Sequence, residues 1–284
     1  MEKCYQFAGV NITVDIPDEK MYPNDRALTA FRSEEAKRAH RFTFEFVDSL
    51  QPPKGDLAAQ VPEFRLYREN DWSVRYVGST AQTWEGAYMR AAHRDREHSV
   101  QLLASRFPGA VGVKTVLGAL SAEHLIARNG GYLFHCSYIE HEGEAILFTA
   151  PSGTGKSTQA DLWHSHRDAR IINGDRAAVR VVDGVPYACG IPFAGSSSYC
   201  ENVTLPLKAI VYLAQAPETT IRRLRGYQAF RRVWEGCSVN TWDPEDMQLV
   251  SDAVSRTVAA VPVFYLPCTP DRSAVIALEQ ALKE

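Results

Sequence analysis

The sequence has little excess charge and no long apolar run. Its 284 residues include 31 Lys or Arg and 34 Asp or Glu, giving a net charge of -3. Partners such as nucleic acid or an anionic membrane call for a basic excess, so we expect neither. No apolar stretch approaches the roughly 18 residues that cross a bilayer, and the first residues lack the basic-then-apolar order of a signal peptide. The sequence therefore predicts a soluble, cytoplasmic protein.

Paired cysteines are also missing. The six cysteines stand far apart, with no C-x-x-C pair and no histidine at zinc-finger spacing, at positions 4, 136, 189, 200, 237 and 268. This excludes the common structural zinc frameworks. In a cytoplasmic protein such cysteines are typically reduced and buried.

A hydrophobic content of 45% and the chain length predict about two domains with real cores. Residues 1–113 form the first, a β-rich α+β domain. Period-two alternation predicts strands at 7–16 and 41–47, and a hairpin that joins strands 64–68 and 72–77 through Glu69-Asn70-Asp71. A helix at 114–128 then opens the second domain, residues 114–284, whose order of strands and helices predicts an α/β fold.

Residues 90–98 (R-A-A-H-R-D-R-E-H) place His93 and His98 near acidic residues. A metal site and a solvated, mixed-charge segment are the two interpretations. Five-residue spacing does not bring two side chains to one face of a helix, so the sequence favours the solvated segment. We assign no chemistry to the first domain.

Residues 150–157 read A-P-S-G-T-G-K-S, one residue away from the phosphate-loop pattern G-x-x-x-x-G-K-[ST]. A buried strand at 144–149 and a helix at 157–165 flank it, as the pattern requires. Backbone N–H groups at a helix N-terminus can hold a polyphosphate, and glycines let the backbone approach it closely. We therefore expect ATP to bind Ser152, Gly153, Thr154, Gly155, Lys156, Ser157 and Thr158.

Within this loop, Lys156 is expected to reach the β- and γ-phosphates, and the Ser157 hydroxyl to bind Mg²⁺. Ala150 replaces the first glycine of the pattern. We expect this change to be mild, because that position mainly ends the strand.

Two further residues are candidates for the chemistry. Residues 131–140 predict one strand that carries His135 and pairs with the strand that feeds the loop. Residues 169–176 predict a short strand that returns Asp175 to the same edge of the sheet as the loop. A carboxylate there can complete the Mg²⁺ shell or take a proton from an attacking hydroxyl. A lone histidine among apolar residues is usually structural, and its position near the γ-phosphate favours a functional role for His135.

The remaining segments are less specific. Residues 177–182 and 185–189 predict a hairpin around Asp183-Gly184, and residues 190–198 a hydroxyl-rich loop that either lines an acceptor pocket or merely connects. Five arginines in 220–232 predict a solvated helix face that beside a kinase site would grip a phosphate or an acidic acceptor. Strands at 208–214 and 261–266 and helices at 244–260 and 272–283 complete the domain.

Several motifs resemble the HPr kinase/phosphorylase family, whose fold is shared with phosphoenolpyruvate carboxykinase. They are L-F-H-C-S, A-P-S-G-T-G-K-S-T, I-N-G-D-R, G-I-P-F-A-G, L-P-L-K-A-I-V-Y-L and V-P-V-F-Y-L, all within residues 131–284. The chain looks most similar to the members associated with the biosynthesis of modified peptides, some of which are seryl kinases. The resemblance implies His135, Lys156 and Asp175 as catalytic residues and Ser157 and Asp175 as Mg²⁺ ligands. It is also compatible with a homo-oligomer.

The chain departs from that family in two ways. The family often has two aspartates where this sequence has Gly174-Asp175, so one carboxylate would serve as both ligand and base, or His135 would take the proton. The phosphorylase signature and the family's N-terminal domain are not recognisable, so we expect neither phosphorylase activity nor HPr as substrate.

The function that the sequence favours is an ATP- and Mg²⁺-dependent kinase acting on a hydroxyl of a peptide, a protein or a small molecule. Two alternatives stay open. One is a carboxykinase-like phosphotransferase acting on a small carboxylic acid. The other is an ATP-sensing binding module that transfers no phosphate.

Overall fold

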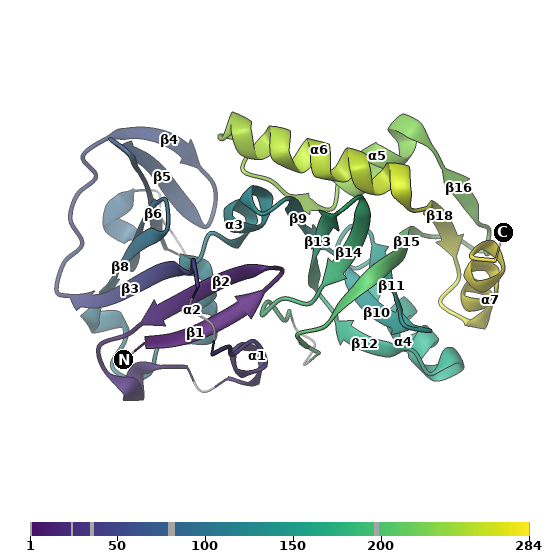
Figure 1. Ribbon diagram of the computed structural model, residues 1–284, viewed down its shortest axis with the longest axis horizontal. Coiled ribbons are helices and arrows are strands. Elements are labelled where there is room, and N and C mark those ends of the chain that lie inside the picture. The colour runs from purple at the N-terminus through teal and green to yellow at the C-terminus, as the bar shows by residue number, and fades with distance from the viewer. Residues whose placement is uncertain (1, 24, 35–36, 79–82, 196–198, 284) are drawn as a thin grey trace. The chain divides into compact units, whose positions relative to one another are not determined.

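The computed structural model describes residues 2–23, 25–34, 37–78, 83–195 and 199–283. It is a mixed α/β structure with two sheets (Figure 1). Backbone proximity divides it into two compact units, Met1–Ser121 and Ala122–Glu284. The domain boundary expected at 113/114 lies earlier in the chain than this division. Within the described residues, no helix combines the length and apolar character needed to cross a membrane.

The first unit contains an eight-stranded sheet in the order β1-β2-β3-β8-β7-β6-β5-β4. Neighbouring strands are antiparallel except for β2 with β3 and β3 with β8. The strands are β1 (Glu2–Phe7), β2 (Val10–Asp15), β3 (His40–Val47), β4 (Asp56–Gln60), β5 (Phe64–Glu69), β6 (Trp72–Val77), β7 (Met89–Arg94) and β8 (Glu97–Leu103). Helices α1 (Arg26–Thr29) and α2 (Val113–Ala119) belong to the same unit.

The hairpin expected at 64–77 is confirmed as β5–β6, with Asn70 at a φ of 52° in its turn. The strand expected at 7–16 is confirmed from residue 10 onward as β2, and its first three residues are not part of it. The chain turns back at Ala8 and Gly9, both at positive φ, so that β1 pairs with β2. Alternation continues through a tight hairpin turn, so the sequence pattern did not reveal the break.

The solvated segment expected at 90–98 is also wrong. It forms the β7–β8 hairpin, in which His93 lies directly opposite His98. Both side chains are buried, at 8% and 5% exposure, and their Nδ1 atoms lie 3.2 Å apart. The helical-spacing argument failed because cross-strand partners, and not residues three or four apart, face each other in a hairpin.

The helix expected at 114–128 consists of two helices, α2 and α3 (Ala122–Arg128). Ser121 lies between them at a φ of 55°, which no α-helix accommodates. Both helices bury apolar residues at the three- and four-residue spacing of the sequence, including Val116 and Leu125. Because this spacing continues across Ser121, it did not reveal the break.

The second unit is built on ten connected strands. They are β9 (Gly131–His135), β10 (Ser137–His141), β11 (Glu144–Thr149), β12 (Arg170–Asn173), β13 (Arg176–Val182), β14 (Val185–Cys189), β15 (Thr204–Gln215), β16 (Arg222–Leu224), β17 (Cys237–Ser238) and β18 (Val263–Cys268). The long strand β15 connects the sheet: its first residues pair with β14, and the rest lies parallel to β11 and β18.

Helices cover the two faces of this sheet (Figure 1). Helices α3, α5 (Gly226–Trp234) and α6 (Pro244–Ala260) lie on one side, and α4 (Lys156–Arg167) and α7 (Arg272–Ala281) on the other. Side chains of β15 alternate between the two cores: Ile210 packs into the first, and Val211 and Leu213 into the second with the fully buried Trp163. This period-two alternation is that of a strand covered on both faces.

The single strand expected at 131–140 is wrong in its length, and its expected pairing with the strand that feeds the loop holds only for its second half. It consists of β9, which pairs with β13 and β17, and β10, which pairs with β11 and β12. Cys136 separates the two strands, and its N–H donates to the carbonyl of Asp175. His135 therefore ends a strand that is hydrogen-bonded to β13 and not to the strand that feeds the phosphate loop.

Candidate functional site

The loop at residues 150–155 connects β11 to α4. Gly153 and Gly155 have φ values of 77° and 118°, where an L side chain would be strained. Gly155 is the N-cap of α4, and no side chain caps the helix there. The first amides of α4 are therefore not capped by a side chain, which is the arrangement that binds phosphate at a helix N-terminus.

Ala150 occupies the position where the phosphate-loop pattern has its first glycine. It is buried in the core beneath α4 and is not among the residues with positive φ. Nothing in this backbone conformation requires glycine, so the substitution costs the loop little.

Lys156 is the first residue of α4, and its side chain is only 8% exposed. Its ammonium donates to the carbonyls of Ala150 at 3.0 Å and Pro151 at 3.4 Å. Burial lowers the pKa of Lys156, although the charge of Asp175 opposes this effect. The ammonium is thus held by two backbone carbonyls of the loop itself.

Asp175 lies at the same edge of the sheet as this loop. Strand β10 is antiparallel to both β11 and β12, so β12 runs parallel to β11 and the two strands end at one edge. Asp175 follows β12, and one of its oxygens lies 3.7 Å from His135 Nε2, while the other lies 3.3 Å from Arg176 Nε. This geometry pairs His135 with Asp175, two of the three residues expected to carry the chemistry, and Lys156 is near enough for its charge to act on His135.

The electrostatics of His135 favour its neutral form. Burial lowers the pKa of His135 from 6.5, the positive charges of Lys156 and Arg176 lower it further, and Asp175 partly offsets them. A neutral imidazole near neutral pH can accept a proton. Its side chain is 41% exposed, so it is open to a reactant.

Backbone hydrogen bonds fix the position of His135. Its N–H donates to the carbonyl of Gly236 at 2.8 Å, and its carbonyl accepts from the Thr149 hydroxyl at 2.9 Å. A side chain at Gly236 would collide with Phe134 and Thr149, at 2.6 and 2.8 Å. The end of α5, the end of β9 and the end of β11 are therefore held together at this point.

Asn173 is a fully buried clamp behind Asp175. Its Nδ2 donates to the carbonyls of Ile191 and Phe193, at 3.2 and 3.1 Å. Its Oδ1 accepts from the N–H groups of Asp175 and Arg176, at 2.9 and 3.0 Å. One side chain thus fixes both the turn that carries Asp175 and the loop that follows β14.

That loop contacts Asp175 directly. A Cβ at Gly195 would lie 2.8 Å from the Cβ and Cγ of Asp175, so only glycine allows this approach. Residues 196–198 of the expected acceptor loop lie outside the described residues. The described part, 190–195, contacts Asn173 and Asp175 through Ile191, Phe193 and Gly195.

A cavity of about 460 Å³ adjoins the phosphate loop, and it is large enough for a nucleoside. The loop, α4 and the ends of β15 and β18 form its walls, through Gly153, Thr154, Gly155, Thr158, Gln159, Leu213, Gln215, Ala216, Cys268 and Pro270. Three of the loop residues expected to bind ATP do not line this cavity: Ser152 and Ser157, which are exposed, and Lys156, which is buried.

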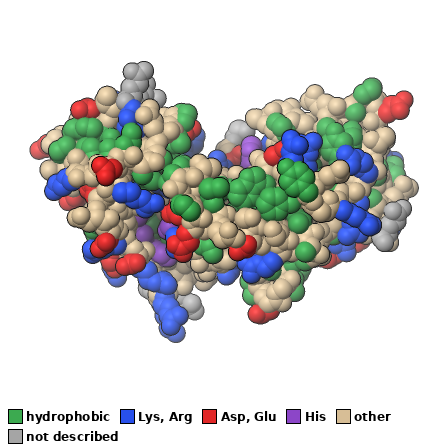
Figure 2. All heavy atoms as spheres, turned by 90° about the horizontal axis from the view of Figure 1, so that it is seen from above, with side chains coloured by type: hydrophobic (Ala, Val, Ile, Leu, Met, Phe, Trp, Pro, Cys, Tyr) green, Lys and Arg blue, Asp and Glu red, His purple; other side chains and the backbone are tan. Residues whose placement is uncertain are grey.

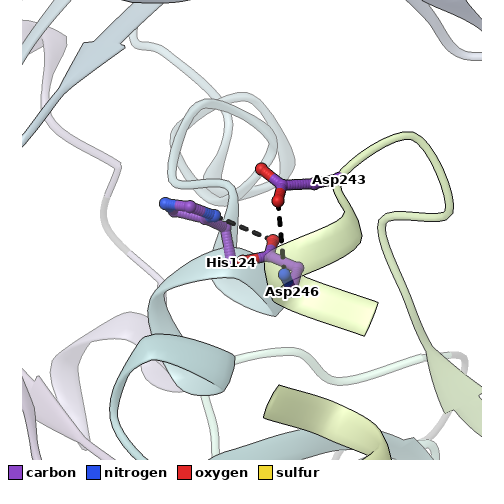
Figure 3. A group of neighbouring side chains, drawn as sticks. All are labelled: His124, Asp243 and Asp246. Carbon is purple, nitrogen blue, oxygen red and sulfur yellow. Dashed lines mark hydrogen bonds and ion pairs between the residues drawn. The ribbon is translucent and has the colours of Figure 1, made fainter. Parts of the chain in front are cut away.

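A second polar group lies at the start of α6. One ligand atom each from His124, Asp243 and Asp246 falls within 4.8 Å of the others, close enough to bind a metal ion (Figure 3). Both oxygens of Asp246 already accept hydrogen bonds, from His124 and Asn240 at 2.8 Å and from Arg128 at 3.3 Å. We therefore assign this group to the packing of α3 against α6.

The electrostatics of Asp246 agree with that role. Burial raises the pKa of Asp246, but the hydrogen bonds from His124 and Asn240 and the charge of Arg128 outweigh it and leave the pKa below 3.8. Asp246 is therefore a charged anchor at neutral pH.

Sequence reasoning missed the residues that position the site. Asn173 looked like part of a turn, and nothing in its neighbourhood marks a clamp. Thr149 and Gly236 act through contacts with segments far away in the chain, for which the sequence carries no local signal.

A family model described as SynChlorMet cassette protein ScmC matches residues 114–275. Among solved structures, the HPr(Ser) kinase/phosphatase from Coxiella burnetii is similar over 53% of this chain and 88% of its own, with 10% sequence identity and a TM-score of 0.32. No curated protein matches the sequence.

Proposed function

This chain belongs to the family of the SynChlorMet cassette protein ScmC, and from that premise we propose that it is an ATP- and Mg²⁺-dependent kinase. It transfers the γ-phosphate to a hydroxyl, on a serine of a peptide or protein or on a small molecule. The observation that supports the proposal is that His135 and Asp175 lie 3.7 Å apart at the sheet edge where the uncapped helix α4 begins with Lys156. A cassette protein is also consistent with action on a modified peptide.

The nucleotide binds through the main chain of the loop. The first amides of α4 hold the phosphates, the cavity beside Thr158 and Leu213 takes the nucleoside, and Lys156 turns from its two carbonyl partners to the β- and γ-phosphates. The lysine keeps its charge in this exchange, because the phosphates are stronger acceptors than the carbonyls.

The residues present fit Mg²⁺. The Ser157 hydroxyl is exposed at the helix start, and the Asp175 carboxylate is partly exposed at the facing turn. Both offer the hard oxygen ligands that Mg²⁺ prefers, and when bound it neutralises charge on the transferring phosphate. These two residues would hold it.

With Asp175 engaged in this way, His135 is the proton acceptor. It is neutral near pH 7, it is accessible, and the Asp175 carboxylate stabilises the imidazolium formed when the acceptor hydroxyl loses its proton. In this proposal the carboxylate binds the ion and the imidazole accepts the proton.

Measurement of ATP binding and of γ-phosphate transfer tests the proposal. Lys156→Ala should abolish ATP binding or turnover, whereas Lys208→Ala removes an exposed lysine paired with Glu144 and should change neither. A Lys156→Ala protein with full turnover would refute the site. Tight ATP binding without phosphate transfer to any acceptor would favour the ATP-sensing module. Phosphate transfer with oxaloacetate or phosphoenolpyruvate would favour the carboxykinase-like reaction.

A further inference from the structure

Four side chains form a row along one edge of the second unit, which we call the arginine–tyrosine row: Tyr212, Tyr265, Arg222 and Arg232. Tyr212 pairs with Tyr265 across β15 and β18, and Tyr265 pairs with Arg222 across β18 and β16. The Arg222 guanidinium lies 5.0 Å from the centre of the Tyr265 ring, and that of Arg232 lies 4.4 Å from the Tyr212 ring. The rings hold both cations in place by cation–π attraction.

The row begins at the candidate site. Tyr212 pairs with Thr149, the last residue of β11, whose hydroxyl donates to the carbonyl of His135. Paired residues of neighbouring strands project to the same face of a sheet, so the row extends outward from Thr149 across three strands. At about 4.8 Å for each strand, Arg222 lies about 14 Å from β11.

The row and the nucleotide cavity lie on opposite faces of the sheet. Leu213 lines the cavity, and Tyr212, the residue before it in β15, projects to the other face, where Tyr265 also packs. His135 and Asp175 are at the sheet edge, which both faces share. A molecule bound along the row can therefore reach that edge without displacing the nucleotide.

The charge of this face is uncompensated. Arg222 and Arg225 are exposed, and neither has a carboxylate within ion-pair distance among the described residues. Arg223 pairs with Phe264, which packs into the other core, so Arg223 projects to the opposite face. Arg231 and Arg232 share Glu235. Tyr227, beside them at the start of α5, is 76% exposed. Figure 2, which looks onto the face of α5 and α6, shows Lys and Arg side chains beside hydrophobic ones there.

From these observations we propose that the arginine–tyrosine row binds an acidic peptide segment of the phosphoryl acceptor. This inference rests on the proposed kinase function and specifies its acceptor. Carboxylates of the peptide pair with Arg222 and Arg225, and its chain crosses the tyrosine rings. An extended peptide advances about 3.4 Å for each residue, so a row of about 14 Å places the acidic residues about four positions from the phosphorylated hydroxyl.

The test uses the full chain and three fluorescein-labelled peptides of about twelve residues. Each carries one serine; the first has a run of Glu about four residues away, the second has Gln in its place and the third has Lys. Binding is followed by fluorescence anisotropy at about 50 mM salt, where charge pairs between exposed groups are least screened. A single-stranded oligonucleotide is a fourth probe, because arginine and aromatic side chains also suit nucleic acid.

We expect the Glu peptide to bind about tenfold more tightly than the Gln peptide, and the Lys peptide not to bind. The variant R222Q/R225Q should lower the affinity for the Glu peptide about tenfold and leave ATP affinity unchanged. The control R256Q/R272Q removes two exposed arginines outside the row, and its affinity should stay within about twofold of wild type. Exposed charge pairs contribute modestly, and tenfold corresponds to about 1.4 kcal/mol.

Three results would overturn the inference: equal binding of the Glu and Gln peptides, an R222Q/R225Q variant that keeps the preference, or tighter binding of the oligonucleotide than of the Glu peptide. Circular dichroism of the variant confirms that it is folded. Failure of the kinase proposal is separate, because it appears as an absence of ATP binding or of phosphate transfer while the peptide preference is intact.

Discussion

Replacement of Asn173 should both destabilise the second unit and slow the reaction. Asn173→Ala removes four hydrogen bonds that involve Ile191, Phe193, Asp175 and Arg176. At about 1 kcal/mol for each, the sum is ~4 kcal/mol. Water can replace part of this at the three bonds that are only partly buried, so we expect a loss of about 2–4 kcal/mol. A typical domain has 5–15 kcal/mol, so the protein should still fold.

The same change frees the turn that carries Asp175. Misplacement of a catalytic group by about 1 Å can cost about a hundredfold in rate. We therefore expect turnover to fall about 10- to 100-fold, while ATP affinity changes little because Asn173 does not touch the phosphate loop. Hydrogen exchange at the amides of Asp175 and Arg176 should rise in parallel.

Denaturant unfolding and steady-state turnover measure the two effects. Asn240→Ala is the matched control: Asn240 is a buried asparagine that donates to Asp246 at the start of α6, outside the candidate site. The Asn240→Ala variant should be less stable than wild type but should keep the turnover of wild type. The clamp would be disproved by an Asn173→Ala protein with the stability and turnover of wild type.

Three further changes test the same geometry. Gly195→Ala should displace the carboxylate of Asp175 and lower turnover at least about tenfold, whereas Gly109→Ala, where an added Cβ meets nothing within 4 Å, should be neutral in the same assay. His135 can accept a proton only above its pKa in the folded protein, and that pKa is lowered from 6.5. Turnover should therefore rise with pH at a point below pH 6.5, and this rise should be absent from the pH–rate profile of His135→Asn. Asp246→Ala should lower the free energy of unfolding by about 3 kcal/mol at pH 7, measured by denaturant unfolding. The charged Asp246 stabilises the fold above its unfolded pKa near 3.8, and this stabilisation is lost as the pH falls through its lower folded pKa. An equally large loss of stability in acid would contradict this explanation.

The sequence predicted local elements well because their signals are contiguous. The strand before the phosphate loop, the glycines within it and the helix after it occupy residues 144–167 without interruption. Helix α6 begins and ends as expected at 244 and 260, because Asp243 caps it and Pro244 opens it.

Pairing between distant segments was harder to foresee. The break at Cys136 contains neither glycine nor proline, and it arises from a hydrogen bond to Asp175, about forty residues away. Likewise, His93 and His98 were interpreted by helical spacing, although their burial follows from the β7–β8 hairpin. The roles of Lys156, His135 and Asp175 remain predictions, which the experiments above address.

Strand β15 limits where residues can be inserted into or deleted from this protein. Consecutive residues of this strand project to different faces of the sheet. Tyr212 lies under Arg232 of α5, and Leu213 packs on the side of α4 and lines the cavity. A shift of one position in the pairing of β15 with β11 would exchange the faces to which these two side chains project, and it would disrupt both the arginine–tyrosine row and the cavity wall. Insertions and deletions should therefore be tolerated in the turns that flank this strand but not within it.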